Sequence, residues 1–280
     1  MDQSSDLPLT HRLPALWPIE RPGLRYGSPE FRRLHVWWPL LAFTLIFGVL
    51  EVFSLDRVIA REWYFNIHTG TWLGAGPGEW WARDLLHTGG GWVVRGVAAA
   101  ALVLWALSFG VGRLRDWRRS AGFVLLSMLL ATLIVGGLKL VTNVDCPWDL
   151  AGFGGHSPYV GLFADRPDVL SRAQCFPGAH ASSGFALVCF YFALRGNSLR
   201  KARWALGLAC FVGIAFSIGQ EARGAHFLSH DLASAAIVWM IQLGLYAWLL
   251  RPAHLLQVQA RQRIGEHAAG EATDNVSRPA

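Results

Sequence analysis

Charged residues are scarce in this chain: 16% of its 280 residues are charged, whereas 53% are hydrophobic. Soluble domains carry about 25% charged residues, so the composition argues against an ordinary soluble domain and for a membrane protein. The four cysteines are too few for a small disulfide-bonded scaffold. Internal repeats and low-complexity tracts are also lacking, so a single membrane domain is predicted.

An early apolar segment is lacking as well. The first 36 residues are polar, carry several arginines and are interrupted by prolines, which does not fit a secretory signal peptide. We therefore expect the first apolar run to be a retained membrane anchor. Residues 251–280 are predicted to be a cytoplasmic tail that is partly disordered, because the end of this tail is polar and rich in Ala and Gly.

Long apolar runs, by contrast, are plentiful. A bilayer core of about 30 Å needs about 20 apolar residues per helix. Six runs approach or meet this length: 37–55, 93–112, 120–142, 180–195, 203–219 and 229–250. The sequence therefore predicts an all-α fold, a six-span transmembrane helical bundle over residues 37–250.

Basic residues gather at the two ends of the chain and in alternate links between the runs. Lys and Arg are enriched in cytoplasmic loops, so both termini are expected in the cytoplasm. The links 56–92, 143–179 and 220–228 would then face the periplasm from an inner membrane. The first of these is either an interfacial segment, as its tryptophans suggest, or an ordinary loop. The basic residues are Arg12, Arg21, Arg25, Arg32, Arg33, Arg113, Arg115, Arg118, Arg119, Arg195, Arg200, Lys201, Arg203, Arg251, Arg261, Arg263 and Arg278.

Three polar motifs fall at the periplasmic ends of predicted spans. Ionisable residues at such positions are costly to bury and therefore indicate function. The first motif runs from Lys139 to Cys146-Pro147, and the second is Pro177-Gly178-Ala179-His180. The third stretches from Arg223 through His226 to His230-Asp231. The topology brings all three to one membrane depth.

These residue types suit an anionic substrate. Lys139 and Arg223 can neutralise phosphate oxygens, and the helix start at Gly178 and Ala179 can add backbone N–H donors. One histidine can attack phosphorus while another protonates the departing oxygen. Taken singly, Lys139 could instead extend to the headgroups, and Arg223 could merely bind lipid phosphate.

The motifs resemble those of the type 2 phosphatidic acid phosphatases, six-span lipid phosphatases that need no metal. The family's Lys-x6-Arg-Pro appears as Lys139 followed by Cys146-Pro147, and its Pro-Ser-Gly-His appears as Pro177 to His180. The Ser-Arg-x5-His-x3-Asp motif is matched around His226, although Gln220 stands six residues before it. The chain thus resembles a divergent branch of this family.

The resemblance implies roles for the matched residues. His226 would form a phosphohistidine, and His180 would protonate the leaving group. Lys139 and Arg223 would hold phosphate oxygens. Either Asp231 or His230 would orient His226: helix geometry favours residue 230, and charge favours residue 231. No metal or cofactor is implied; the alternative is that His226, His230 and Asp231 bind a metal.

The expected function is hydrolysis of a lipid phosphate or pyrophosphate at the periplasmic face. The partners are the phosphorylated lipid and the bilayer, with no nucleic acid. The alternatives are a lipid phosphotransferase and an inactive protein that binds or transports lipid phosphates. Cys146 and Cys175 share a periplasmic link, so an oxidising environment would allow a disulfide between them, with two free thiols as the alternative.

Overall fold

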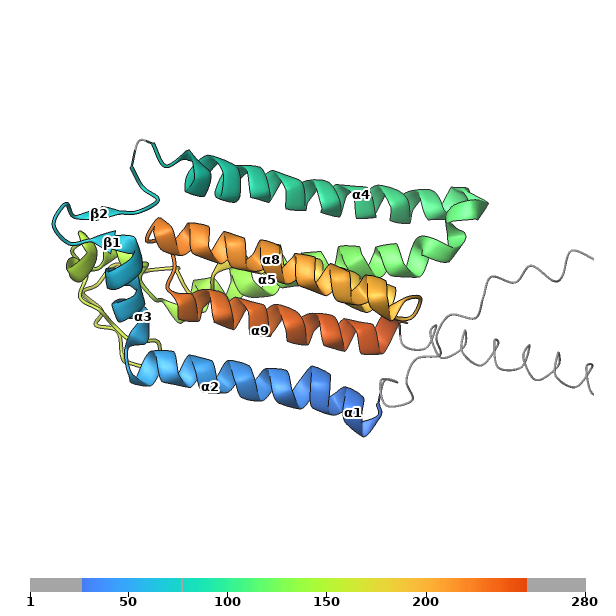
Figure 1. The fold of residues 1–280 in the computed structure, drawn as a ribbon, viewed down its shortest axis with the longest axis horizontal. Helices are drawn as coiled ribbons and strands as arrows, with labels where there is room; N and C mark the ends of the chain where they lie inside the picture. Colours follow the sequence, from blue (N-terminus) through green and yellow to red (C-terminus); the bar gives the residue numbers. More distant parts are fainter. Residues whose placement is uncertain (1–26, 77, 251–280) are drawn as a thin grey trace, which may run out of the picture.

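The computed structural model describes residues 27–76 and 78–250, and within them the chain forms a long helical bundle (Figure 1). Helices α2, α4, α5, α8 and α9 run alongside one another. The α-helices are α1 (Pro29–Arg32), α2 (Trp38–Val52), α3 (Leu55–Ile59), α4 (Gly90–Gly110), α5 (Arg118–Thr142), α6 (Ala179–Phe185), α7 (Cys189–Arg195), α8 (Leu199–Ala222) and α9 (Leu228–Leu245).

Shorter elements extend or connect these helices. The π-helical turns are η3 (Arg33–Trp37), η4 (Ala60–Tyr64), η5 (Trp81–Gly89) and η10 (Tyr246–Leu250). The 3-10 turns are η6 (Gly112–Trp117), η7 (Pro147–Asp149), η8 (Ala151–Phe153) and η9 (Ala186–Val188). Strands β1 (Phe65–Asn66) and β2 (Thr71–Trp72) form an antiparallel hairpin in which Phe65 pairs with Trp72.

Local chemistry explains several element boundaries. The Ser28 side chain accepts a 3.0 Å hydrogen bond from the Phe31 N–H and caps α1, and the Ser198 hydroxyl caps α8 in the same way. Pro39, near the start of α2, has no N–H to donate, and the turn before it is π-helical. Helix α5 ends where Asn143 adopts a left-handed conformation with φ of 53°.

Among the residues that the structure describes, five helical segments are long and apolar enough to cross a membrane: 29–52, 81–110, 112–149, 199–222 and 228–250. They correspond to five of the six predicted runs, which makes the chain a helical, multi-pass membrane protein. The remaining run, 180–195, forms α6, η9 and α7, which pack against α8, but this segment is not among the five.

The first predicted link is more structured than a loop. It contains α3, η4 and the hairpin, and the span that follows begins at Trp81 within η5, earlier than the predicted residue 93. Figure 1 shows α3, β1 and β2 together at one end of the bundle, which we call the site end. The predicted cytoplasmic tail at 251–280 and residues 1–26 lie outside the described residues.

Burial is uneven across the bundle. The main core lies among the inner helices, with Phe123, Val135, Phe192 and Val238 fully buried. Helices α2 and α4 instead leave apolar side chains exposed, such as Leu45. A bilayer would cover these side chains, because apolar surface is costly to keep in water.

Candidate active site

Chain segments far apart in the sequence meet at the site end. Lys139 comes from the last turn of α5, His180 from the first turn of α6, and Arg223 and His226 from the connection between α8 and α9. The charges of Lys139 and Arg223 both act on His226, and the charge of Arg223 also acts on His180. The three predicted motifs therefore form one electrostatically coupled site.

A buried histidine–carboxylate pair lies at its centre. The Nδ1–H of His226 donates to Oδ1 of Asp231 at 2.7 Å, and the two residues are only 6% and 1% exposed. His226 precedes α9, and Phe227 between them is extended, so the residue five positions later can reach back to the ring. His230 is not the partner: its ring centroid lies 6.2 Å from that of His226.

The surroundings keep His226 uncharged. Burial lowers the pKa of its imidazole to about 3, and the positive charges of Lys139 and Arg223 act in the same direction. With Nδ1–H committed to Asp231, the lone pair of the neutral ring is on Nε2. That is the form of histidine that can act as a nucleophile.

Gly178 packs directly on this pair. A Cβ at residue 178 would overlap Oδ1 of Asp231 and would lie 2.7 Å from Nδ1 of His226. The N–H of Gly178 donates to the His230 carbonyl at 3.0 Å, so it is already used within the protein. Of the two predicted backbone donors, Ala179, at the start of α6, is therefore the better placed for a phosphate.

His180 is held by a segment that the sequence analysis treated only as a link. Its Nε2 lies 3.0 Å from the carbonyl oxygen of Leu86 in η5, and its ring stacks on Phe216 with centroids 4.4 Å apart. A carbonyl can only accept, so Nε2 carries the proton and Nδ1 is left to exchange a proton with a substrate. The motif has a serine where this chain has Gly178, and the hydroxyls of the nearby Ser182 and Ser183 donate to helix carbonyls.

Three more polar residues reach this region and were not predicted. The His87 ring lies 4.5 Å from that of His180, and its Nδ1 is 2.9 Å from Nε2 of Gln220. Burial lowers the pKa of the Arg223 guanidinium, and the nearby charge of Arg83 lowers it further. The rule that selected the other motifs, polar residues at the periplasmic end of a span, would also have selected residue 87.

One disulfide and one ion pair hold the loop between α5 and α6. Cys146 and Cys175 form a disulfide with Cα atoms 5.1 Å apart. Both Nη atoms of Arg166 donate to the Asp145 carboxylate, which raises the pKa of Arg166. Together these links tie the segment after Lys139 to the segment before His180.

The hairpin covers the loop that carries His226. Trp72 belongs to a buried aromatic cluster with Phe65, Phe153 and Phe227, and its ring lies against Gly224. Gly224 has φ of 71°, and a Cβ there would overlap the indole. Glycine is therefore needed both for the backbone conformation and for the close approach.

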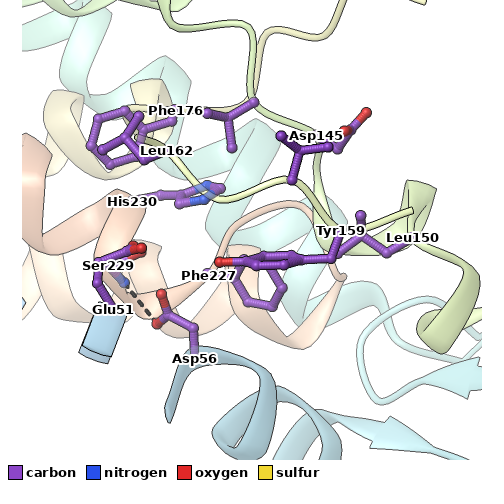
Figure 2. A pocket seen from close by; sticks show the side chains of 12 residues that line it. Glu51, Asp56, Asp145, Leu150, Tyr159, Leu162, Phe176, Phe227, Ser229 and His230 are labelled. Carbon is purple, nitrogen blue, oxygen red and sulfur yellow. Dashed lines mark hydrogen bonds between the residues drawn. The ribbon is translucent and has the colours of Figure 1, made fainter. Parts of the chain in front are cut away.

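His230 borders a separate small cavity of about 10 Å³, drawn in Figure 2. Figure 2 shows its ring between Phe176 and Phe227, on the side away from Asp56. Asp56 accepts a 3.0 Å bond from the N–H of Ser229, and burial raises the pKa of its carboxyl. A cavity of this size has room for about one water, so it is not a substrate pocket.

Within residues 27–76 and 78–250, no group of three or more His, Cys, Asp or Glu side chains is arranged to hold a metal ion. His226 and Asp231 bond to one another, and His230 faces the cavity beside Asp56. His230 therefore does not join His226 and Asp231 in one set of metal ligands.

The model of the PAP2 superfamily matches residues 120–253, which contain Lys139, His180, Arg223, His226 and Asp231. No curated protein and no solved structure gave a significant match.

Proposed function

Since residues 120–253 match the model of the PAP2 superfamily, we propose that this membrane protein hydrolyses a lipid phosphate or pyrophosphate at the periplasmic face. The reaction passes through a phosphohistidine on His226. The observation that carries this proposal is the buried 2.7 Å bond between His226 and Asp231, which leaves a neutral Nε2 beside two cations.

The first half-reaction transfers the phosphoryl group to the protein. The Nε2 lone pair of His226 forms a bond to phosphorus while the bond from phosphorus to the leaving oxygen breaks. The leaving oxygen takes a proton from Nδ1 of His180 when that ring is protonated. Asp231 stabilises the positive charge that develops on His226, as a buried carboxylate does for the histidine of a catalytic triad.

The second half-reaction regenerates the protein. Water attacks the phosphohistidine, His180 takes a proton from this water through Nδ1, and the bond between Nε2 and phosphorus breaks. Inorganic phosphate leaves, and His226 is again neutral. The same imidazole thus acts as acid and then as base.

Cationic side chains hold the transferred group throughout. Lys139 and Arg223 are partly buried beside His226, and the N–H of Ala179 points from the start of a helix. Their positive charge offsets that of the phosphoryl oxygens, which is the largest electrostatic requirement of this chemistry.

The position of the site favours a lipid substrate. Lys139 and His180 are at the ends of α5 and α6, which both pack against α4, and α4 exposes apolar side chains along its length. A lipid could keep its acyl chains beside this surface while its phosphate reaches the cations. The basic residues in 112–119 and 195–203, at the other ends of the helices, support a periplasmic orientation of the site.

The test is phosphate release by the purified protein in detergent micelles, over a panel of lipid monophosphates and pyrophosphates, with and without a chelator. We expect release that is insensitive to the chelator and abolished by His226→Ala, whereas His68→Ala, an exposed residue in the hairpin loop, retains it. Radiolabelled phosphate should remain on the protein, as an acid-labile and base-stable adduct, after a quench.

Other results would favour the alternatives. Tight binding of lipid phosphates with no release over the panel would indicate an inactive binding protein. Transfer of the label to a second lipid would indicate a phosphotransferase. For orientation, Arg115→Cys should resist an impermeant thiol reagent in intact cells while Phe163→Cys, in the loop between α5 and α6, reacts; the opposite pattern would reverse the topology.

A further inference from the structure

His87 lies beside the proposed phosphate site but outside residues 120–253, the part of the chain that matches the superfamily. It is in η5, at the start of the second span, and its side chain is exposed. Its ring centroid is 4.5 Å from that of His180, and the positive charge of Arg223 acts on it. The exposed ring therefore lies beside two of the three matched motifs, those of His180 and of Arg223.

A chain of hydrogen bonds fixes the tautomer of His87. Nη1 of Arg223 lies 3.4 Å from Oε1 of Gln220, and a guanidinium can only donate. This assigns the amide oxygen of Gln220 to Arg223 and its NH2 group to the histidine. Nε2 of Gln220 then donates to Nδ1 of His87 at 2.9 Å. Since Nδ1 accepts, the proton of the neutral ring is on Nε2.

We propose that His87 is a catalytic residue whose Nε2–H donates a hydrogen bond to a phosphoryl oxygen of the substrate. The inference rests on the proposed phosphatase function. Gln220 stands six residues before His226, where the family motif has an arginine. The Nε2–H of His87, oriented by Gln220, is thus a hydrogen-bond donor in the region where the motif arginine would supply one.

The same geometry separates this role from that of His180. A protonated His87 would direct an Nδ1–H at the NH2 group of Gln220, and two donors facing each other repel. His87 therefore stays neutral, and it binds a phosphoryl oxygen through a hydrogen bond without transferring a proton. Its bond strengthens as negative charge develops on the phosphoryl oxygens. Proton transfer to the leaving oxygen remains with His180.

The experiment compares two phosphate monoesters with the same alkyl chain, an alkyl phosphate and an alkyl-substituted nitrophenyl phosphate. The nitrophenolate leaves without needing a proton, whereas the alkoxide needs one. Because His87 is assigned to the phosphoryl oxygens, His87→Phe should lower kcat/KM for both esters by a similar factor, about 10-fold to 100-fold. His180→Asn should act mainly on the alkyl ester. His68→Phe, also exposed, is the matched control and should match the wild type.

Two further variants test the role of the tautomer. His87→Gln keeps an N–H near the position of Nε2 and should recover part of the activity that His87→Phe loses. Gln220→Leu should lower activity in the wild type but have little further effect in the His87→Phe background, because it acts through the ring. Unchanged melting temperatures would show that these variants remain folded.

Three results would overturn the inference. Activity of His87→Phe within twofold of the wild type would remove the residue from the site. A loss confined to the alkyl ester would make His87 a proton donor and contradict the assigned tautomer. Full additivity of Gln220→Leu and His87→Phe would break the link between them. A wild type that hydrolyses neither these esters nor any lipid of the panel refutes the proposed function and this inference with it.

Discussion

Replacing Gly178 with serine would restore the residue that the family motif has at this position, yet we expect it to reduce activity. The backbone of residue 178 has φ of −70° and ψ of 102°, which any residue can adopt, so the substitution creates no backbone strain. The difficulty is steric. The new Cβ would overlap Oδ1 of Asp231 and lie 2.7 Å from Nδ1 of His226. Both side chains are buried, so one of them must move.

The size of the effect follows from the bond that is lost. The 2.7 Å bond from His226 to Asp231 involves a carboxylate, and such bonds contribute about 1.5–3 kcal/mol. If this stabilisation is lost in the transition state, kcat falls about 10-fold to 150-fold. Gly178→Ala should have nearly the same effect as Gly178→Ser, because Cβ is the atom that collides.

The assay is the initial rate of phosphate release in micelles at saturating substrate. Gly207→Ala in α8 is the matched control, since a Cβ there meets no atom within 4 Å. In an Asp231→Asn background, Gly178→Ala should cost much less than it does alone, because the two changes act on one bond. Wild-type kcat in Gly178→Ala, or equal losses in both backgrounds, would refute the reasoning.

Three other predictions follow from the same contacts. Asp231→Asn should preserve the fold but lower kcat by about 10²–10⁴, measured by phosphate release, because the amide can favour the wrong tautomer of His226. The folded-state pKa of His226 is about 3, below the unfolded value of about 6.5, so the unfolded chain binds more protons and stability should fall as pH decreases from 6.5 towards 3. Thermal unfolding over this range should show a weaker pH dependence in His226→Gln; an unchanged dependence would contradict the lowered pKa. The double substitution Cys146→Ser and Cys175→Ser opens a loop with a sequence separation of 29 and should destabilise the folded state by about 2–4 kcal/mol in denaturant unfolding; an unchanged midpoint would argue against the bond.

The sequence predicted the helical membrane fold well, because membrane spans are long, apolar and nearly local in origin. The prediction was weakest for residues 180–195. Most of their side chains are buried, and the run is split between α6, η9 and α7. It packs among other helices, so its own hydropathy says little about where it lies.

The polar motifs could be placed at one end of the bundle because each adjoins a span, but sequence could not choose the partner of His226. That choice depended on where α9 begins. The helix starts at Leu228, after His226, so helical spacing does not apply between residues 226 and 231. His87 was missed because the second span was predicted to begin at residue 93, although it begins at Trp81. Its contact with Gln220, 133 positions away, could not be read from the sequence.

The departures from the family motifs are better explained as compensated changes than as decay. Asp231 stands one residue later than the motif aspartate. Its carboxylate occupies the space that a Cβ at residue 178 would need, and residue 178 is glycine, which has no Cβ. Gln220 replaces the motif arginine, and it binds a histidine from another helix and the arginine three residues later. Cys146 replaces a second motif arginine, and it is bonded to the segment that leads to His180. Each of these altered residues therefore contacts another part of the site. Restoring single motif residues should therefore impair the protein, and this expectation separates a working divergent site from a degenerate one.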